Sequence, residues 1–181
     1  MTCRDAEHEV YGSSPPVVKA LENWDGKSSS DIVAIYHRFC QEKHFVPRII
    51  ELAQHKTLEK GATWLLKHHL ENKHKLNARE IASVYKLAQE LENWEARLHI
   101  LQCVPYMPIG AVEKRGVELF LRDCLVDRNK FVRAWAYNGF YEMSLQYPEY
   151  TEETKKLCEM GMRDEAPSVK ARIRNIMKNG F

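Results

Sequence analysis

The feature that most constrains this chain is a pattern that recurs after 37 residues. The stretch LVDRNKFVRAWAYNGF at 125–140 aligns with MRDEAPSVKARIRNIM at 162–177. In each, an apolar residue precedes an aspartate, a valine with an adjacent cation follows, and small or apolar residues continue at helical spacing. Val132 and Val169 occupy the same place, 37 residues apart. A fixed period of this length is typical of proteins built from stacked copies of one supersecondary unit.

Two weaker copies extend this register upstream. Leu58 and Trp94 take the position of Val132 and Val169, which gives intervals of 36, 38 and 37 residues. Positions 0, 4 and 7 of each copy mark one face of a helix, and small residues among them would let a neighbouring helix come close. We therefore expect the four first positions to share one buried depth. The later positions are Ala62, Leu98, Ala136 and Ile173, and then Leu65, Leu101, Gly139 and Ile176.

The rest of the chain also has helical periodicity, and almost no segment alternates as a strand does. Asn77 with Glu80 matches a capping box, and Pro167 suits the first turn of a helix. The sequence predicts an all-α chain with a flexible N-terminus at 1–14 and a single domain at 15–181. The expected helices cover 15–23, 30–42, 46–55, 58–73, 78–91, 94–104, 112–126, 130–146, 152–163 and 168–178.

The pattern L-x-D-x-x-x-x-V-R/K-x-x-A/I resembles the second-helix signature of HEAT repeats. The copies at 125–140 and 162–177 match it well, whereas those at Leu58 and Trp94 keep only the apolar register. The resemblance covers about residues 45–179. It implies a short right-handed α-solenoid of about four HEAT-like helix pairs, with an N-terminal capping pair, in which each pair packs only against its neighbours. The implied pairs are 46–73, 78–104, 112–146 and 152–178, with 15–42 as the cap.

The HEAT resemblance also implies a role for the charged residues of the pattern. In that family the cation after the valine commonly pairs with the turn aspartate of the same or an adjacent repeat. Arg133 and Lys170 would pair in this way with Asp127 and Asp164. We therefore interpret these four residues as a structural ladder and not as a ligand site.

Trp135 stands three residues after Val132, at the edge of the buried stripe, where it would either complete the core or face a concave groove. Arg97 and Arg172 hold the same offset in neighbouring copies. An Arg–Trp–Arg row would combine stacking with anion contact, although large apolar side chains at such an edge are more often buried. The predicted partner-binding residues are Arg97, Trp135, Tyr137, Arg172 and Trp64.

Metal and catalytic motifs give a negative prediction. His37, Cys40 and His44 share a helical face, but the two histidines lie about 10 Å apart along the helix axis, too far for bonds of about 2 Å to one zinc ion. No P-loop, nucleophile elbow or zinc-protease motif occurs. We therefore expect no metal, no cofactor and no catalytic residue. The histidines His68, His69 and His74 are interpreted as a polar helix end whose side chains point in different directions.

Composition bounds the location and the partners. The five cysteines are widely spaced, without a C-x-x-C pair, and the first residues lack the apolar run of a signal peptide. We expect a cytoplasmic protein with no membrane partner. The net charge of +2 does not by itself indicate a polyanionic partner. Lys170, Arg174 and Lys178 do form a cationic stripe, which we interpret as the solvated cap of a terminal repeat.

Two functions remain open at this point. The favoured one is a non-enzymatic binding or scaffold module that presents a concave helical face to a protein partner. The alternative comes from a weaker similarity to HEAT-like DNA alkylation-repair glycosylases, which use concave-face Trp, Asp and Arg residues to hold alkylated DNA. Only Trp135, Asp127 and Arg97 could take those roles, and the match is loose. Nucleic acid is the less favoured partner because the net charge is low for a duplex-binding protein.

Overall fold

The described part of the chain, residues 16–180 of a computed structural model, consists of ten α-helices and two short 3-10 helices, without a strand. The all-α prediction is confirmed, and the expected helices all occur with ends shifted by up to three residues. The predicted flexible N-terminus lies outside the described residues. The helices are α1 (Pro16–Glu22), α2 (Ser29–Phe39), α3 (Phe45–Leu52), α4 (Glu59–Glu71), α5 (Ala78–Ala88), α6 (Trp94–Cys103), η1 (Val104–Tyr106), α7 (Lys114–Leu125), α8 (Lys130–Gln146), η2 (Pro148–Tyr150), α9 (Thr151–Asp164) and α10 (Pro167–Gly180).

Side-chain caps fix several helix starts. Asn77 and Glu80 form the predicted capping box, with each side chain accepting a hydrogen bond from the other residue's backbone N–H at 3.0 and 2.8 Å. Asn93 accepts two backbone N–H bonds at the start of α6, and Asn129 accepts one at the start of α8. Pro167 is the first residue of α10, where its missing N–H has no partner to lose.

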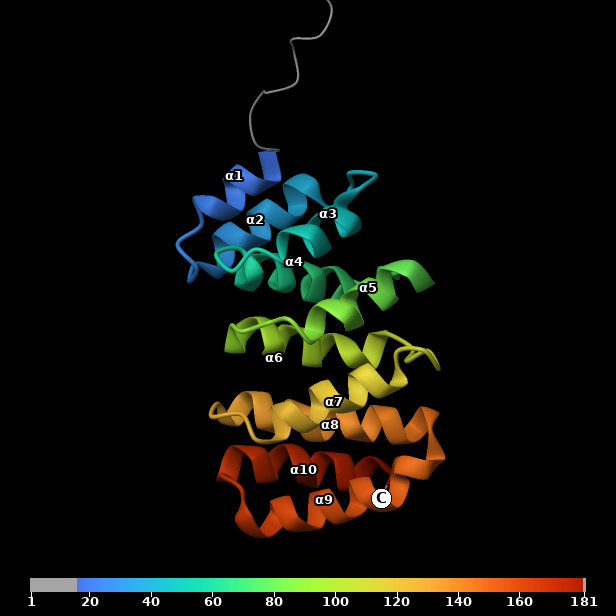
Figure 1. The fold of residues 1–181 in the computed structure, drawn as a ribbon. Coiled ribbons are helices and arrows are strands. Elements are labelled where there is room, and N and C mark those ends of the chain that lie inside the picture. The colour runs from blue at the N-terminus through green and yellow to red at the C-terminus, as the bar shows by residue number, and fades with distance from the viewer. Residues whose placement is uncertain (1–15, 181) are drawn as a thin grey trace, which may run out of the picture.

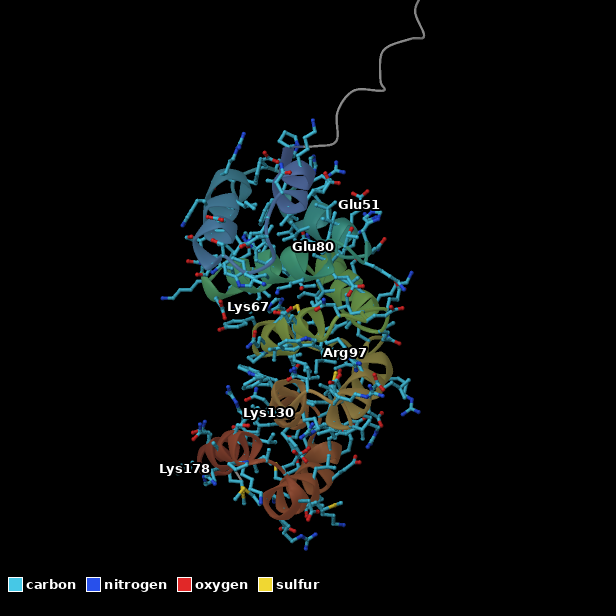
Figure 2. The ribbon with its side chains drawn as sticks, turned by 90° about the vertical axis from the view of Figure 1, so that its left-hand side faces the viewer. Glu51, Lys67, Glu80, Arg97, Lys130 and Lys178 are labelled. Atoms are coloured by element: carbon cyan, nitrogen blue, oxygen red, sulfur yellow. The ribbon has the colours of Figure 1, made fainter. Side chains whose placement is uncertain are left out.

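The helices stack in two rows (Figure 1). In one row α2 packs against α4, α4 against α6, α6 against α8, and α8 against α10; in the other, α3 packs against α5, and α5 against α7. Each of α3, α5, α7 and α9 also packs on the helix that follows it. The first row, here called the second-helix row, follows the left edge of Figure 2 and bows inward at α6 and α8.

The second-helix row has a common register, but not the one predicted at α6. Leu58, Val132 and Val169 are buried as expected, whereas Trp94 is 41% exposed. Ala96 is fully buried and takes the expected place of Trp94, which changes the intervals to 38, 36 and 37 residues. The reason is local: Asn93 caps α6, so Trp94 is the first helical residue and stands two positions before the buried stripe.

The same shift applies along the rest of α6. Ile100 and Cys103, which are fully buried, occupy the two later positions of the register, whereas Leu98 is only partly buried. Two positions rotate a residue by about 200° around a helix. The predicted face of α6 is therefore wrong at Trp94 and Leu98, whereas Leu101, the third residue predicted for it, is fully buried.

The core follows the stack instead of gathering at one centre. A large cluster of buried apolar side chains runs from α1 to α8. A second, smaller cluster joins α8 to the last two helices, through Ala134 and Tyr137 of α8, Cys158 of α9, and Val169, Ile173 and Ile176 of α10. The last helix pair thus packs mainly on one side of α8.

Glycines permit the closest helix contacts. A Cβ atom added to Gly139 in α8 would overlap the Leu121 side chain of α7, and Leu121 is itself fully buried. A Cβ atom on Gly161 in α9 would lie 2.6 Å from Cδ1 of Ile173 in α10. Both glycines therefore set the distance between neighbouring helices.

We predict that Gly139→Ala lowers the free energy of unfolding by about 1–3 kcal/mol, because the new methyl group overpacks the contact with Leu121. The matched control is Gly116→Ala in α7, where the nearest atoms belong to the flexible end of the Gln89 side chain. This control should be neutral or stabilising, since alanine is the better helix former. Urea unfolding of both variants measures the difference. Equal stabilities would contradict the close packing of α7 and α8.

Candidate binding surface

Ion pairs connect successive members of the second-helix row at its turn end. Nε of Arg133 donates to the Glu165 carboxylate at 2.9 Å, and Nη1 donates to the Asp127 backbone carbonyl at 2.8 Å. Lys60 of α4 pairs with Glu95 of α6 at 2.7 Å. The Arg133–Glu165 and Lys60–Glu95 pairs bridge neighbouring helix pairs.

The carboxylate partners in this ladder differ from the predicted ones. Arg133 binds the Glu165 side chain and only the backbone of Asp127. Lys170 donates to the backbone carbonyl of Arg163 at 2.8 Å instead of pairing with Asp164. The turn before α10 places Glu165, the residue after Asp164, within reach of α8.

Arg97 belongs to the ladder and not to the predicted Arg–Trp–Arg row. With the corrected register it follows Ala96 as Arg133 follows Val132. Its guanidinium group pairs with Asp123 and, at 3.3 Å, with Asp127. Figure 2 shows it on the side of α6 toward α7, away from the edge marked by Lys67 and Lys178. The side chains that the glycosylase alternative requires, Arg97 and Asp127, are thus engaged with each other.

One face of α8 lies outside the fully buried stripes, although Trp135 on it packs against the edge of the large core cluster. Phe131, Trp135, Asn138, Glu142 and Leu145 follow one another at intervals of 4, 3, 4 and 3, which keeps them on one side of the helix. The two end residues are exposed and the middle three are half-buried. We call these five residues, together with Arg172 of α10, the α8 surface.

Trp135 and Arg172 meet on the α8 surface. The Arg172 guanidinium carbon lies 3.9 Å from the centre of the Trp135 ring, the distance of a stacked cation–π contact. Both side chains are half-buried, and burial lowers the pKa of the Arg172 guanidinium group. The predicted pairing of stacking with positive charge is therefore present between α8 and α10.

Arg172 differs from the other half-buried arginines of residues 16–180, because no carboxylate of that region pairs with it. The other four each have a carboxylate within 4.0 Å. They are Arg48 with Glu51, Arg97 with Asp123 and Asp127, Arg122 with Glu118 and Glu153, and Arg133 with Glu165.

Tyr137 and Trp64, the other predicted groove residues, lie elsewhere. Tyr137 is buried in the smaller core cluster, with its ring against Gly161, so it does not line an open groove. Burial raises the pKa of Tyr137 to about 12. Trp64 is half-buried on α4, where its ring stacks on His68 with centroids 4.7 Å apart and lies 5.5 Å from the Lys67 ammonium group.

His68, His69 and His74 belong to an aromatic cluster that also contains Tyr36 and Phe45. The rings of His69 and His74 stack with centroids 4.2 Å apart, so these two side chains converge, contrary to the predicted divergence. Nδ1 of His69 lies 3.2 Å from the Tyr36 hydroxyl, and burial lowers the pKa of His69 to about 4. Within residues 16–180 no three histidine, cysteine or carboxylate side chains come together as a metal site would require.

Comparison of the chain with models of protein families, with curated proteins and with solved structures found no match. In the described helices no segment is both long enough and apolar enough to cross a bilayer.

Sequence reasoning missed four residues of the α8 surface: Phe131, Asn138, Glu142 and Leu145. The spacing of 4, 3, 4 and 3 residues within 131–145 could have identified them, because residues at these intervals lie on one face of a helix. The two apolar stripes of α8 occupy its other faces.

We predict that a double-mutant cycle on Arg133→Ala and Glu165→Ala gives a coupling energy of about 1–3 kcal/mol, since these side chains are only 21% and 13% exposed. The matched pair Lys56 and Glu92, at 75% and 68% exposed, should give a clearly smaller coupling, because water screens both charges. Urea unfolding of the single and double variants provides both values. A coupling of Arg133 with Glu165 no larger than that of the exposed pair would argue against a stabilising ladder.

Proposed function

We propose that this chain is a non-enzymatic binding module: a short right-handed α-solenoid of HEAT-like helix pairs, capped by α1 and α2, whose second-helix row holds a protein partner. Support for the architecture comes from the shared register of Leu58, Ala96, Val132 and Val169 and from the neighbour-by-neighbour packing of α4, α6, α8 and α10. Such a stack leaves one long face of each second helix without a neighbour.

The observation that carries the binding role is the Trp135–Arg172 contact on the α8 surface. Tryptophan and arginine are the residue types most often found at the energetic centre of protein interfaces. Here the two are preassembled and half-buried, and no described carboxylate neutralises the arginine. The mutual contact already restricts the rotamers of Trp135 and Arg172, which lowers the entropic cost of binding a partner.

The glycosylase alternative receives no comparable support. It needs an aspartate and an arginine directed at DNA, yet Asp127 and Arg97 form an ion pair that links α6 to the turn before α8. We therefore favour a protein partner.

Trp135→Ala should weaken partner capture by about 30-fold, because truncating a central interface aromatic typically costs 2 kcal/mol or more. The measurement is quantitative affinity capture from nuclease-treated extract of the native cell, with the full chain as bait. Trp94→Ala is the matched control: it removes an exposed tryptophan that does not belong to the α8 surface.

A second variant separates binding from folding. Asn138→Trp adds bulk to the α8 surface without removing a core contact, so it should also reduce capture while the helical circular-dichroism spectrum stays unchanged. If both variants bring down the same proteins as the unmodified chain, the α8 surface is not the binding face.

A further inference from the structure

A second charge without a described partner lies on the α8 surface. The Glu142 carboxylate is half-buried, and burial raises its pKa. Among residues 16–180 no lysine or arginine pairs with it. The surface therefore presents a cation beside Trp135 and an anion beyond Asn138, each partly removed from water and each unneutralised by the described chain.

The positions along α8 of Trp135, on which Arg172 stacks, and of Glu142 define a length. Trp135 and Glu142 are seven residues apart on α8, which corresponds to about 10 Å along the helix axis. Extended chain advances about 3.3 Å per residue, so three residues of an extended peptide cover this length. Asn138 lies between the two charges, and no described group bonds its side-chain amide. That amide offers both a donor and an acceptor, as a peptide main chain requires.

We propose that the α8 surface binds an extended segment of a protein partner that carries an Asp or Glu over Arg172 and Trp135 and a Lys or Arg about three to four residues away, over Glu142. The proposal rests on the binding role proposed above and adds the chemistry of the partner. Phe131 and Leu145, exposed at the two ends of the surface, offer contacts for apolar residues that flank the charged pair.

Charge complementarity favours a peptide over a polyanion. A nucleic acid or an anionic membrane would bring phosphates to Glu142 as well as to Arg172, and like charges at close range oppose binding. Two other cations of the second-helix row, Lys60 and Lys67, are already paired with Glu95 and Glu71. A segment bearing both signs of charge matches the surface where a uniform polyanion does not.

The test is a selection from displayed random 12-residue peptides against the immobilised full chain. The unmodified chain should enrich peptides with an acid and a base three to four residues apart. Arg172→Glu should weaken the best synthetic peptide at least tenfold in fluorescence anisotropy. The double variant Arg172→Glu with Glu142→Lys should select the inverse order of charges. Arg174→Glu, an exposed cation on the same helix, is the control and should leave the preference unchanged.

Several outcomes would overturn the inference. Enriched peptides without an acid preference, or an acid preference that Arg172→Glu does not alter, would remove the proposed partner chemistry; the binding role would still stand if Trp135→Ala abolished capture. Arg172-dependent binding of a 20-base-pair DNA duplex or of phosphatidylserine vesicles, without peptide enrichment, would assign the surface to a polyanion. Absence of any enrichment together with Trp135-independent capture would contradict both proposals.

Discussion

The contact between neighbouring second helices is the interaction on which the rest of this structure depends. Small side chains on the buried stripes, Ala62, Ala96 and Ala136 among them, let α4, α6 and α8 approach closely enough to exclude water from the large apolar side chains beside them. Each helix then buries its stripe against two neighbours. The core grows by addition along the row, which explains why the last helix pair has a cluster of its own.

The candidate surface is a consequence of that packing. A helix in the middle of a two-row stack has neighbours before it, after it and behind it, so only one face remains, and α8 shows this arrangement through its contacts with α6, α7, α9 and α10. The ladder of Arg97 and Arg133 uses the charges near the turns. The free face of α8 and α10 carries Trp135, the Asn138 amide, and the charges of Arg172 and Glu142, for which no partner is described. The proposed recognition of a charged peptide is based on these four side chains.

The sequence was sufficient for the helices and for the two strong copies of the repeat, because their aspartate, valine and cation fix the register at α8 and α10. It was insufficient at α6. Trp94 fits an apolar pattern as well as Ala96 does, and only the cap at Asn93 decides which of them begins the buried stripe. Because the prediction started the stripe at Trp94, it wrongly assigned Arg97 to the groove instead of the ladder. The sequence also predicted Asp164 as the carboxylate of the last turn, whereas Glu165 is the residue that forms an ion pair, with Arg133. Which of these neighbours faces α8 depends on the geometry of the turn, and residue spacing does not determine it.

Native-state hydrogen exchange, followed for each amide at increasing sub-denaturing urea, tests the neighbour-by-neighbour packing most directly. Helices α9 and α10 join the stack mainly through α8, with one ion pair from α9 to α7. Their amides should therefore exchange through a partial opening of lower free energy than the opening that exposes α6, which has neighbours on both sides. Graded opening from the end toward the middle is the predicted result. A single unfolding free energy shared by α4, α6, α8 and α10 at every urea concentration would show one indivisible core and would contradict the account.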